Sequence, residues 1–300
     1  MSEILKHCPS CLAAEHFEVD RQGECGLRMC QRCSLLFVSP RPTREETEAI
    51  YSREYFEGTS EFGNPEGYQS HAGGYLARAS FLVDWLCSKT GLQGGRWLDV
   101  GCGPGYLVEA AARAGFDACG VDVSLDAVEA GIGRGLSLLH GAAEDLGKLV
   151  TPEFQVVSML DTLFHVREPR QVLFAASKLL STGGILLAGP FDLGPGLSIA
   201  PGQTRQFDFD QLGVPEHLSF VNQRSMECVL PELGFSQLRF EPMAQSPGAV
   251  VKKHAGFLPI WLLDLFRRIL RLFPRFRVWL HRLAGKQVNR QAGYVIAVKN

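Results

Sequence analysis

A glycine-rich turn between an apolar run and a helical pattern constrains this 300-residue chain more than any other feature. Residues 96–100 (Arg-Trp-Leu-Asp-Val) are apolar enough for a buried strand, and Gly101-Cys102-Gly103-Pro104-Gly105 follows before a helical pattern that ends near Gly115. Further short apolar runs alternate with helical patterns at 118–123, 136–140, 154–160 and 185–188. Strands that alternate with helices in this way predict βαβ units and a largely parallel sheet.

The helix between the fourth and fifth runs is the best marked. Pro169 suits its first turn, and Gly183-Gly184 is expected to stop it. Apolar side chains recur in between at helical spacing, namely Val172, Leu173, Ala176, Leu179 and Leu180. Farther along, the sequence predicts a helix near 224–233, a strand near 238–240 and a last strand at 294–298.

The glycine-rich turn has the chemistry of a nucleotide-binding loop. Glycines let the backbone approach a ligand closely, and the start of the following helix offers unpaired N–H groups. Asp122 ends the second run, 21 residues after Gly101. An acidic side chain at that place can accept hydrogen bonds from both hydroxyls of a ribose. A tight turn without a ligand is the alternative for the glycines alone, and Asp122 favours the nucleotide.

Residues 98–105 resemble the first motif of class I S-adenosylmethionine (SAM)-dependent methyltransferases, and Asp122 matches their ribose-binding acid. Residues 141–146 are similar to the family's adenine-side loop, and 180–186 to the turn into its fifth strand. The resemblance covers about residues 95–240. It implies an α/β, Rossmann-like seven-stranded sheet whose antiparallel last strand residues 294–298 would supply. It also implies SAM as cofactor, held by Asp99, Gly101, Cys102, Gly103, Gly105, Asp122, Val123, Ala143, Glu144 and Asp161.

Two positions bear on that assignment. The family often has an acid directly after the glycine at 141, where this chain has Ala142, so Glu144 or Asp145 is the candidate for the adenine contact. A dehydrogenase is the alternative, because dehydrogenases share this fold. Its loop usually has a glycine three residues after the second one, where this chain has Tyr106.

The candidate catalytic residues follow the fourth run. Residues 161–166 resemble an acid-x-x-acid-His-Val segment of ubiquinone-pathway O-methyltransferases, in which the two acids and the histidine are associated with a divalent metal. This chain keeps Asp161 and His165 but has Phe164 at the second acid. The resemblance therefore implies His165 as a base or substrate-orienting residue, and a role in shaping the loop is its alternative. Glu216-His217 is the second candidate, because the resemblance places this region along the acceptor pocket. His217 would be the base, and a solvent-exposed loop histidine is the alternative.

Four cysteines near the N-terminus predict a metal site. Cys8 and Cys11 form one Cys-x-x-Cys pair, and Cys30 and Cys33 form another, with 18 residues between the pairs. This spacing is typical of a tetrahedral structural zinc ribbon, which leaves no open position for catalysis. Redox-active or buried free thiols are the alternative. A segment of about 40 residues cannot bury enough core alone, so the metal would supply its folding energy. Methyltransferases with such a ribbon, followed by a Leu-Phe-Val-Ser-Pro-Arg-Pro segment as at 36–42, look like this chain.

A basic apolar segment lies at residues 255–283. It contains Trp261 and a single acid, Asp264, and its six arginines are Arg267, Arg268, Arg271, Arg275, Arg277 and Arg282. A basic amphipathic helix with a tryptophan fits a peripheral, in-plane contact with a membrane. A helical cap over the sheet, with its arginines in water, and a patch for an RNA backbone are the alternatives.

These observations predict five regions and a setting for the chain. They are a zinc ribbon at 1–40, a helical lid or linker at 41–90, a SAM-binding core at 91–250, a C-terminal helical insertion at 251–287 and the last core strand at 288–300. Tyr68, Tyr75 and Arg78 are candidate lid residues, and aromatic packing without a lid role is the alternative. The chain has nine cysteines, an odd number, and its first ten residues have no apolar secretion-signal stretch. We therefore expect a reducing cytoplasmic setting, at most peripheral at a membrane.

The predicted function is methyl transfer from SAM to a small-molecule, sugar or lipid-linked acceptor, onto a hydroxyl group. A net charge of -2 gives no global attraction to nucleic acid, which is not expected as a partner. The alternatives are an RNA methyltransferase whose ribbon contacts RNA, and a non-catalytic SAM-binding module.

Overall fold

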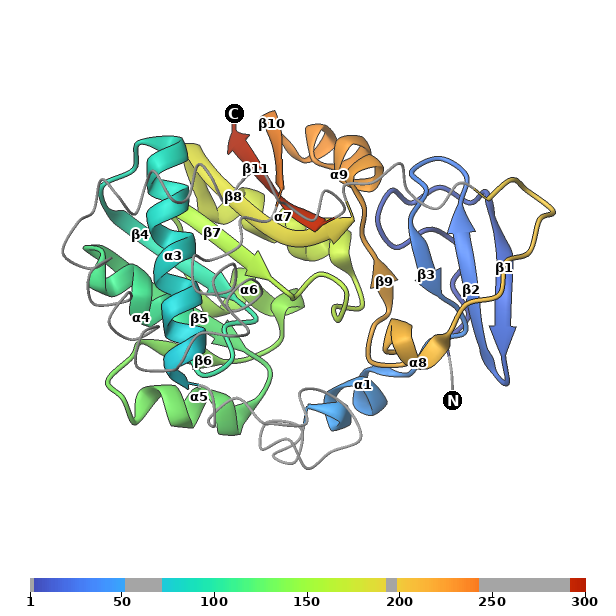
Figure 1. Ribbon diagram of the computed structural model, residues 1–300, viewed down its shortest axis with the longest axis horizontal. Helices are drawn as coiled ribbons and strands as arrows, with labels where there is room; N and C mark the ends of the chain where they lie inside the picture. The colour runs from blue at the N-terminus through green and yellow to red at the C-terminus, as the bar shows by residue number, and fades with distance from the viewer. Residues whose placement is uncertain (1–2, 52–71, 193–198, 243–291) are drawn as a thin grey trace, which may run out of the picture.

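Two β-sheets lie side by side in the computed structural model, which describes residues 3–51, 72–192, 199–242 and 292–300. A seven-stranded sheet forms the larger part, and a four-stranded sheet built mainly from the N-terminus stands beside it (Figure 1). The predicted helical insertion at 251–287 and the predicted lid residue Tyr68 lie outside the described residues.

The seven-stranded sheet has the order β10-β11-β8-β7-β4-β5-β6. Strands β4 to β8 pair in parallel, and β11 runs antiparallel between β8 and β10. The Rossmann-like methyltransferase sheet and its antiparallel last strand are thereby confirmed. Its strands are β4 (Gly95–Val100), β5 (Phe116–Asp122), β6 (Leu138–His140), β7 (Phe154–Leu160), β8 (Leu180–Asp192), β10 (Phe235–Pro242) and β11 (Ala292–Lys299).

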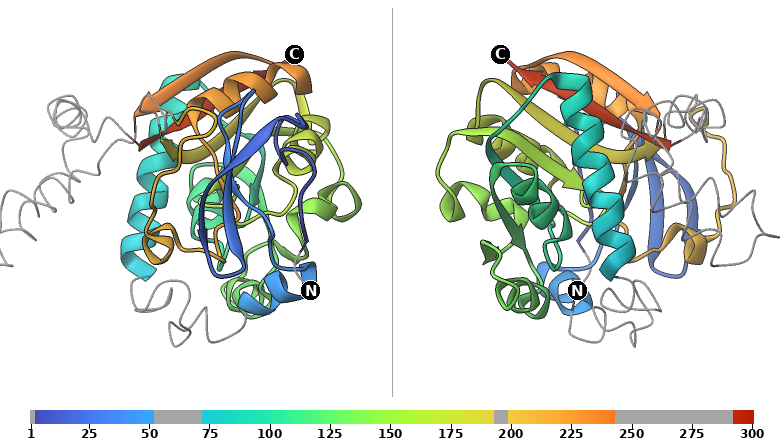
Figure 2. Two further views of the ribbon diagram at one scale, coloured as in Figure 1. Left: turned by 90° about the vertical axis from the view of Figure 1, so that its right-hand side faces the viewer. Right: turned by 60° about the vertical axis from the view of Figure 1, so that its left-hand side comes forward.

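Helices cover both faces of this sheet because its inner strands are apolar on both sides. In β4, Trp97 packs with helices α3 (Ala72–Thr90) and α4 (Tyr106–Arg113), whereas the next residue, Leu98, joins the cluster that contains α7 (Pro169–Leu179). Alternate residues of a strand point to opposite faces, so a near-continuous apolar run is what a doubly covered parallel strand requires. Figure 2 shows α3 lying across one face of the sheet.

Shorter helices complete the core. Helix α5 (Leu125–Ile132) follows β5, and Ser124 caps it by accepting a hydrogen bond from the Ala127 N–H. Helix α6 (Leu146–Leu149) follows a 3₁₀ turn at Ala143–Asp145. Helix α9 (Gln223–Val229) begins at a capping box of Asn222 and Ser225. No helix among the described residues is long and apolar enough to cross a membrane.

The four-stranded sheet contains a strand that the sequence analysis did not place. Strands β1 (His16–Gln22), β2 (Cys25–Cys30) and β3 (Leu36–Val38) come from the predicted ribbon. The fourth, β9 (Ser219–Phe220), pairs antiparallel with β3. A strand of two residues is too short to show an alternating pattern in the sequence. Strand β9 forms because its backbone pairs with the edge of β3. Helices α1 (Arg44–Ile50) and α8 (Phe209–Leu212) lie near this sheet (Figure 1).

Two predicted helix ends were wrong. Helix α7 stops at Leu179, and Leu180 already pairs with Phe154 in the sheet. Gly183 and Gly184 lie within β8, where Gly183 takes a φ of 77° at an irregularity between β7 and β8. The predicted helix at 224–233 is divided, because Pro231 lacks an N–H and starts a separate 3₁₀ turn.

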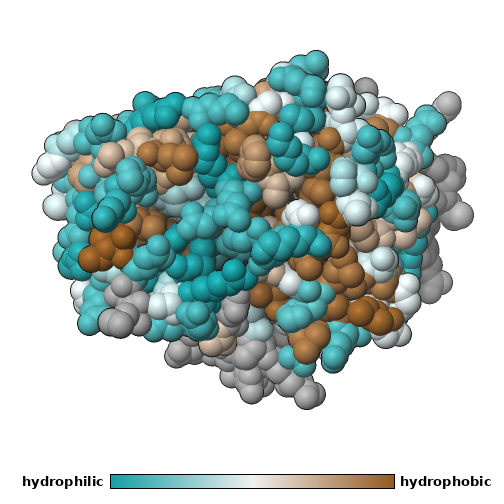
Figure 3. Space-filling view, turned by 180° about the vertical axis from the view of Figure 1, so that it is seen from behind, coloured by the Kyte–Doolittle hydropathy of each residue, from teal (hydrophilic) through white to brown (hydrophobic). Residues whose placement is uncertain are grey.

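The surface mixes polar and apolar residues, as the view from behind in Figure 3 shows. Among the described residues, Leu125 and Ile132 of α5 and Leu139 of β6 are large apolar side chains exposed at the β6 end of the sheet. Scattered exposed apolar residues are ordinary on a protein surface.

Candidate active site

A cavity of about 600 Å³ opens at the carboxyl ends of the parallel strands. Its wall is built from the turns that follow β4, β5, β6 and β7. The chain places β5 and β6 on one side of β4 and then β7 and β8 on the other. Ligands of open α/β sheets bind at such a switch point, outside the carboxyl ends of the strands. The volume lies within the usual range of small-molecule sites, about 300–1,000 Å³.

The glycine-rich turn forms one wall, and its glycines differ in what they do. Gly101 has a φ of 72°, and a Cβ there would lie 2.5 Å from the Thr162 Oγ1. Gly103 has a φ of 51° and lines the cavity, yet no atom lies within 4 Å of the place of its Cβ. The space beside Gly103 is therefore open to a ligand. Gly105 does not line the cavity. A Cβ at this position would lie 2.8 Å from the Leu136 Cδ1 and 3.1 Å from the Leu138 Cδ1, so the glycine makes room for these two leucines.

Asp122 fixes the shape of this wall. Its Oδ2 accepts a hydrogen bond of 2.7 Å from the Gly103 N–H, and its Oδ1 accepts one of 2.8 Å from the Ser124 N–H. Burial raises the pKa of the Asp122 carboxyl, and the two N–H groups oppose that rise. A carboxylate has about four acceptor sites. Asp122 can therefore hold the glycine turn and still accept hydrogen bonds from a ligand.

Asp99 lies deeper, at the end of β4, with 4% of its surface exposed. Its Oδ1 accepts a 2.7 Å hydrogen bond from the Ser158 hydroxyl, which accepts one of 2.8 Å from the Trp97 indole N–H. Burial raises the pKa of Asp99 to about 7, against the effect of the Ser158 hydrogen bond. A cation bound in the cavity would favour the charged form of this carboxyl.

The remaining residues predicted to bind the cofactor also line the cavity: Cys102, Val123, Ala143, Glu144 and Asp161. Both candidates for the adenine contact, Glu144 and Asp145, already interact with other groups of the protein. The Glu144 Oε1 accepts a 2.9 Å hydrogen bond from the Arg167 N–H. Asp145 pairs with Lys148 at 2.6 Å and with Arg44 at 3.0 Å, and these two cations lower its pKa.

The other end of the cavity is formed by β7 and α3. Asp161 follows β7 with a φ of 53°, and its carboxylate lies 4.0 Å from an Arg78 guanidinium nitrogen. Tyr75 stacks on Tyr106 with 5.6 Å between ring centroids. Tyr75 and Arg78, the described members of the predicted lid, line the cavity.

His165 belongs to a cluster that also contains Glu216 and His217. The His165 Nδ1 lies 3.7 Å from the Glu216 Oε1, and the two histidine rings are 4.7 Å apart. Burial lowers the pKa of His165 to about 3, and His217 adds to this shift. His165 is therefore neutral at physiological pH. His165 lines the cavity, whereas His217 packs behind it.

The backbone holds the cluster together. The Phe164 carbonyl accepts a 2.7 Å hydrogen bond from the Leu218 N–H, which ties the loop of His217 to the loop of His165. The His217 Nδ1 lies 2.7 Å from the Leu212 carbonyl oxygen. A carbonyl can only accept, so this nitrogen donates. Glu216, predicted as part of the second candidate together with His217, is 8% exposed.

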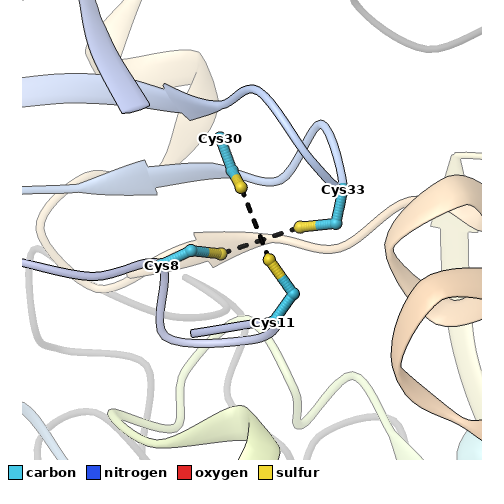
Figure 4. A group of neighbouring side chains, drawn as sticks. All are labelled: Cys8, Cys11, Cys30 and Cys33. Carbon is cyan, nitrogen blue, oxygen red and sulfur yellow. Dashed lines mark hydrogen bonds between the residues drawn. The ribbon is translucent and has the colours of Figure 1, made fainter. Parts of the chain in front are cut away.

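The four predicted metal ligands converge in the N-terminal sheet. Figure 4 shows the sulfur atoms of Cys8, Cys11, Cys30 and Cys33 pointing toward one another, and all lie within 4.8 Å. The Cys8–Cys33 sulfurs are 3.7 Å apart, and the Cys11–Cys30 sulfurs 3.5 Å. A tetrahedral zinc with Zn–S bonds of about 2.3 Å separates its sulfurs by roughly 3.8 Å. This group, hereafter the cysteine cage, is buried and fits a zinc ion.

Comparison with known protein families identifies the core. A family model described as a methyltransferase domain matches residues 71–239, which is more than half of the chain. The chain belongs to this methyltransferase family. The assignment to SAM-dependent methyltransferases made from residues 98–105 and Asp122 is thereby confirmed, and the dehydrogenase alternative is set aside.

Curated methyltransferases resemble parts of the chain. A protein of Psychrobacter arcticus named ubiquinone biosynthesis O-methyltransferase is 28% identical over 173 residues, which are 53% of this chain and 67% of that protein. One of the same name from Methylococcus capsulatus is 38% identical over 108 residues, covering 34% of this chain and 46% of that protein. The chain thus spans about half the length of several curated relatives that it matches.

A solved structure shares the fold of the methyltransferase core. The magnesium protoporphyrin IX methyltransferase of Synechocystis PCC 6803, crystallised with S-adenosylhomocysteine, superposes with a TM-score of 0.51 at 15% identity. The match covers 86% of this chain and 100% of that one. At this identity, the likeness speaks for the fold alone.

Proposed function

We propose that the chain transfers the methyl group of SAM to a hydroxyl group of a small-molecule acceptor bound beside His165. One observation carries the proposal: a single cavity is lined both by the glycine turn with Asp122 and by His165, which follows β7. Relatives named O-methyltransferase support the hydroxyl as the methylated group. A sugar or a lipid-linked molecule is a narrower choice of acceptor. A lipid-linked acceptor would suit the basic apolar segment at 255–283, which lies outside the described residues.

At the cofactor end, the chain supplies a fixed wall. Asp122 would accept the ribose hydroxyls, Gly103 would admit the ligand against the backbone, and Asp99 would favour its positive charge. Asp161, Val123, Cys102, Ala143 and Glu144 complete the proposed wall. Bound there, SAM supplies an electrophilic methyl group on its sulfonium. Holding acceptor and donor in line can lower the barrier by about 7–11 kcal/mol.

At the acceptor end, the chain handles a proton. His165 lines the cavity, and its ring can accept the proton that the acceptor hydroxyl loses if the Glu216 carboxylate offsets the low pKa that burial gives the ring. The Glu216 carboxyl lies 3.7 Å from that ring and would stabilise an imidazolium. His217 packs on the ring from behind and is the second candidate base. A positioned base typically contributes a factor of about 10²–10⁴.

The cysteine cage has a different role. Four thiolates fill the tetrahedral positions of a zinc ion, so none is left for an acceptor or water. The cage residues do not line the cavity. We assign the zinc a structural role in the N-terminal sheet.

Transfer of labelled methyl from SAM to cell extracts tests the proposal. We expect label in the small-molecule fraction and none in total RNA. His165→Ala and Glu216→Gln should each slow transfer by about 10²–10⁴-fold. Affinity for S-adenosylhomocysteine should change by less than about threefold, since neither residue is part of the cofactor wall. Glu227→Gln, on the exposed side of α9, is the matched control and should transfer methyl normally.

Three outcomes would contradict the proposal. Label in RNA would support the RNA methyltransferase instead. Cofactor binding without transfer to any extract would support a non-catalytic module. Unchanged transfer by His165→Ala, His217→Ala and Glu216→Gln would remove the proposed base.

A further inference from the structure

We infer that Arg41 is a positioning residue for the cofactor cavity, and that it couples metal binding in the cysteine cage to affinity for SAM. Arg41 belongs to the Ser-Pro-Arg-Pro segment at 39–42, which the proposed chemistry does not use. The inference rests on the proposed function, because it concerns the same cavity.

The two chain segments that leave the cage pair with each other at Arg41. One segment runs back from Cys8 to Glu3, and the other runs from Cys33 through β3 to Arg41. The Glu3 N–H donates to the Arg41 carbonyl at 2.8 Å, and the Arg41 N–H donates to the Glu3 carbonyl at 2.9 Å. The Leu5 N–H donates to the Ser39 Oγ at 2.9 Å. The place of Arg41 thus depends on both segments that the cage holds.

The Arg41 guanidinium reaches from this pairing to the cavity wall. Only 3% of the side chain is exposed. Its Nε donates to the Glu3 carboxylate at 3.0 Å, and one terminal nitrogen donates to the Glu168 carboxylate at 2.5 Å. The other terminal nitrogen donates to the Arg167 carbonyl. A planar guanidinium is suited to three partners in fixed directions, which a lysine ammonium cannot reproduce.

Residues 167 and 168 carry the contact into the cavity. The Arg167 guanidinium returns to the N-terminal segment, donating to the Glu3 carboxylate and the Pro42 carbonyl. The backbone N–H groups of Arg167 and Glu168 both point to the Glu144 Oε1, at 2.9 and 3.4 Å. Glu144, Arg167 and Glu168 line the cavity. A continuous chain of hydrogen bonds therefore joins the cage segments to the cofactor wall.

Thermodynamic linkage turns this connection into a measurable effect. A small metal domain is ordered by its metal, so loss of zinc would release the segments that place Glu3 and Arg41. If Arg41 holds the wall in its binding shape, zinc must raise cofactor affinity, and the cofactor must raise zinc affinity by the same factor.

Calorimetry with S-adenosylhomocysteine on the full-length zinc protein tests the positioning role. Arg41→Lys keeps the charge but loses the planar guanidinium with its three fixed donors. We expect this variant to bind S-adenosylhomocysteine about tenfold more weakly while it still holds one zinc per chain. Glu3→Gln, a milder change at a half-exposed carboxylate, should weaken binding in the same direction. Glu18→Gln is the matched control, because it breaks an ion pair with Arg21 in the same sheet and touches no part of the cavity wall.

The rate of zinc transfer to a coloured chelator tests the coupling. In the wild-type protein, S-adenosylhomocysteine should slow this transfer about tenfold, and in Arg41→Lys it should have less than a twofold effect. A residue that only stabilises the fold would speed zinc loss equally with and without the ligand.

The inference is overturned if Arg41→Lys binds S-adenosylhomocysteine within twofold of the wild type, or if the ligand protects zinc equally in both proteins. Either result would leave the proposed function standing. A wild-type protein that binds no S-adenosylhomocysteine would instead overturn the proposed function, and this inference with it.

Discussion

At the residue scale, cofactor binding should depend most on Asp122, because its carboxylate holds the glycine turn and lines the cavity. We expect Asp122→Asn to weaken S-adenosylhomocysteine binding about 10- to 100-fold, since a hydrogen bond to a charged group contributes about 1.5–3 kcal/mol. Asp117→Asn is the matched control on the same strand, where the side chain is 83% exposed. Calorimetry on both variants measures this difference. Equal affinities of Asp122→Asn and Asp117→Asn for S-adenosylhomocysteine would show that Asp122 does not contact the ligand.

His165 should make stability depend on pH. Its pKa in the folded protein is about 3, below its ordinary value of about 6.5, so the unfolded chain binds the extra proton first. The stability associated with neutral His165 is complete above pH 6.5 and declines as the pH falls toward 3. Between pH 7.5 and 5, the wild type should lose about 2 kcal/mol more than His165→Gln.

Urea unfolding of both proteins at several pH values measures that difference. His140→Gln replaces an exposed histidine and is the matched control for the substitution itself. Parallel stability curves for wild type and His165→Gln would contradict the buried neutral state of His165.

Individual residues were predicted unevenly from the sequence. Asp122 and Gly103 were found because a motif fixes their spacing, and both line the cavity. Glu216 was predicted only as the neighbour of His217, because its contact with His165 joins two loops that no local pattern connects. Gly105 was expected to bind the cofactor, yet it gives space to two leucines behind the turn.

At the scale of elements, the turn between β4 and α4 is specified by its glycines. Gly103 and Gly135 both have positive φ, and neither has an atom within 4 Å of the place of its Cβ. Each alanine substitution should therefore cost a similar 1–2 kcal/mol of backbone strain. Only Gly103 lines the cavity, so Gly103→Ala should also lose most S-adenosylhomocysteine binding.

Thermal unfolding and calorimetry on the two variants test this comparison. We expect both variants to lose the same stability, and we expect only Gly135→Ala to retain binding of S-adenosylhomocysteine. Normal binding by Gly103→Ala would show that the ligand does not approach this turn.

The elements themselves follow sequence patterns where they are long and apolar. The run at 154–160 was predicted with the bounds that β7 has. Strand β8 begins five residues before the predicted run, because pairing with β7 extends it across Gly183 and Gly184. Strand β9 depends on a partner edge and has no pattern of its own.

At the scale of the whole molecule, the cysteine cage and the methyltransferase core share one apolar cluster. All four cage cysteines pack in the cluster that contains Leu98 of β4 and Val172 of α7. We expect one zinc per chain by mass spectrometry of the native protein. Cys11→Ser should lose the zinc and lower the melting temperature by several degrees or more.

Cys25→Ser is the matched control, because this half-buried cysteine of the same sheet lies outside the cage. It should keep the zinc and nearly the wild-type melting temperature. A wild-type protein without zinc after mild purification, or a Cys11→Ser variant of unchanged stability, would contradict the structural role of the metal.

The central claim is that the turn at 101–105 and Asp122 form a binding site for SAM. Titration calorimetry of the wild-type protein with SAM and with S-adenosylhomocysteine tests it most directly. We expect saturable binding of both compounds with one site per chain, and no binding of nicotinamide dinucleotides. A folded protein that gives no heat with either sulfur compound, or that binds a nicotinamide dinucleotide tightly instead, would contradict it.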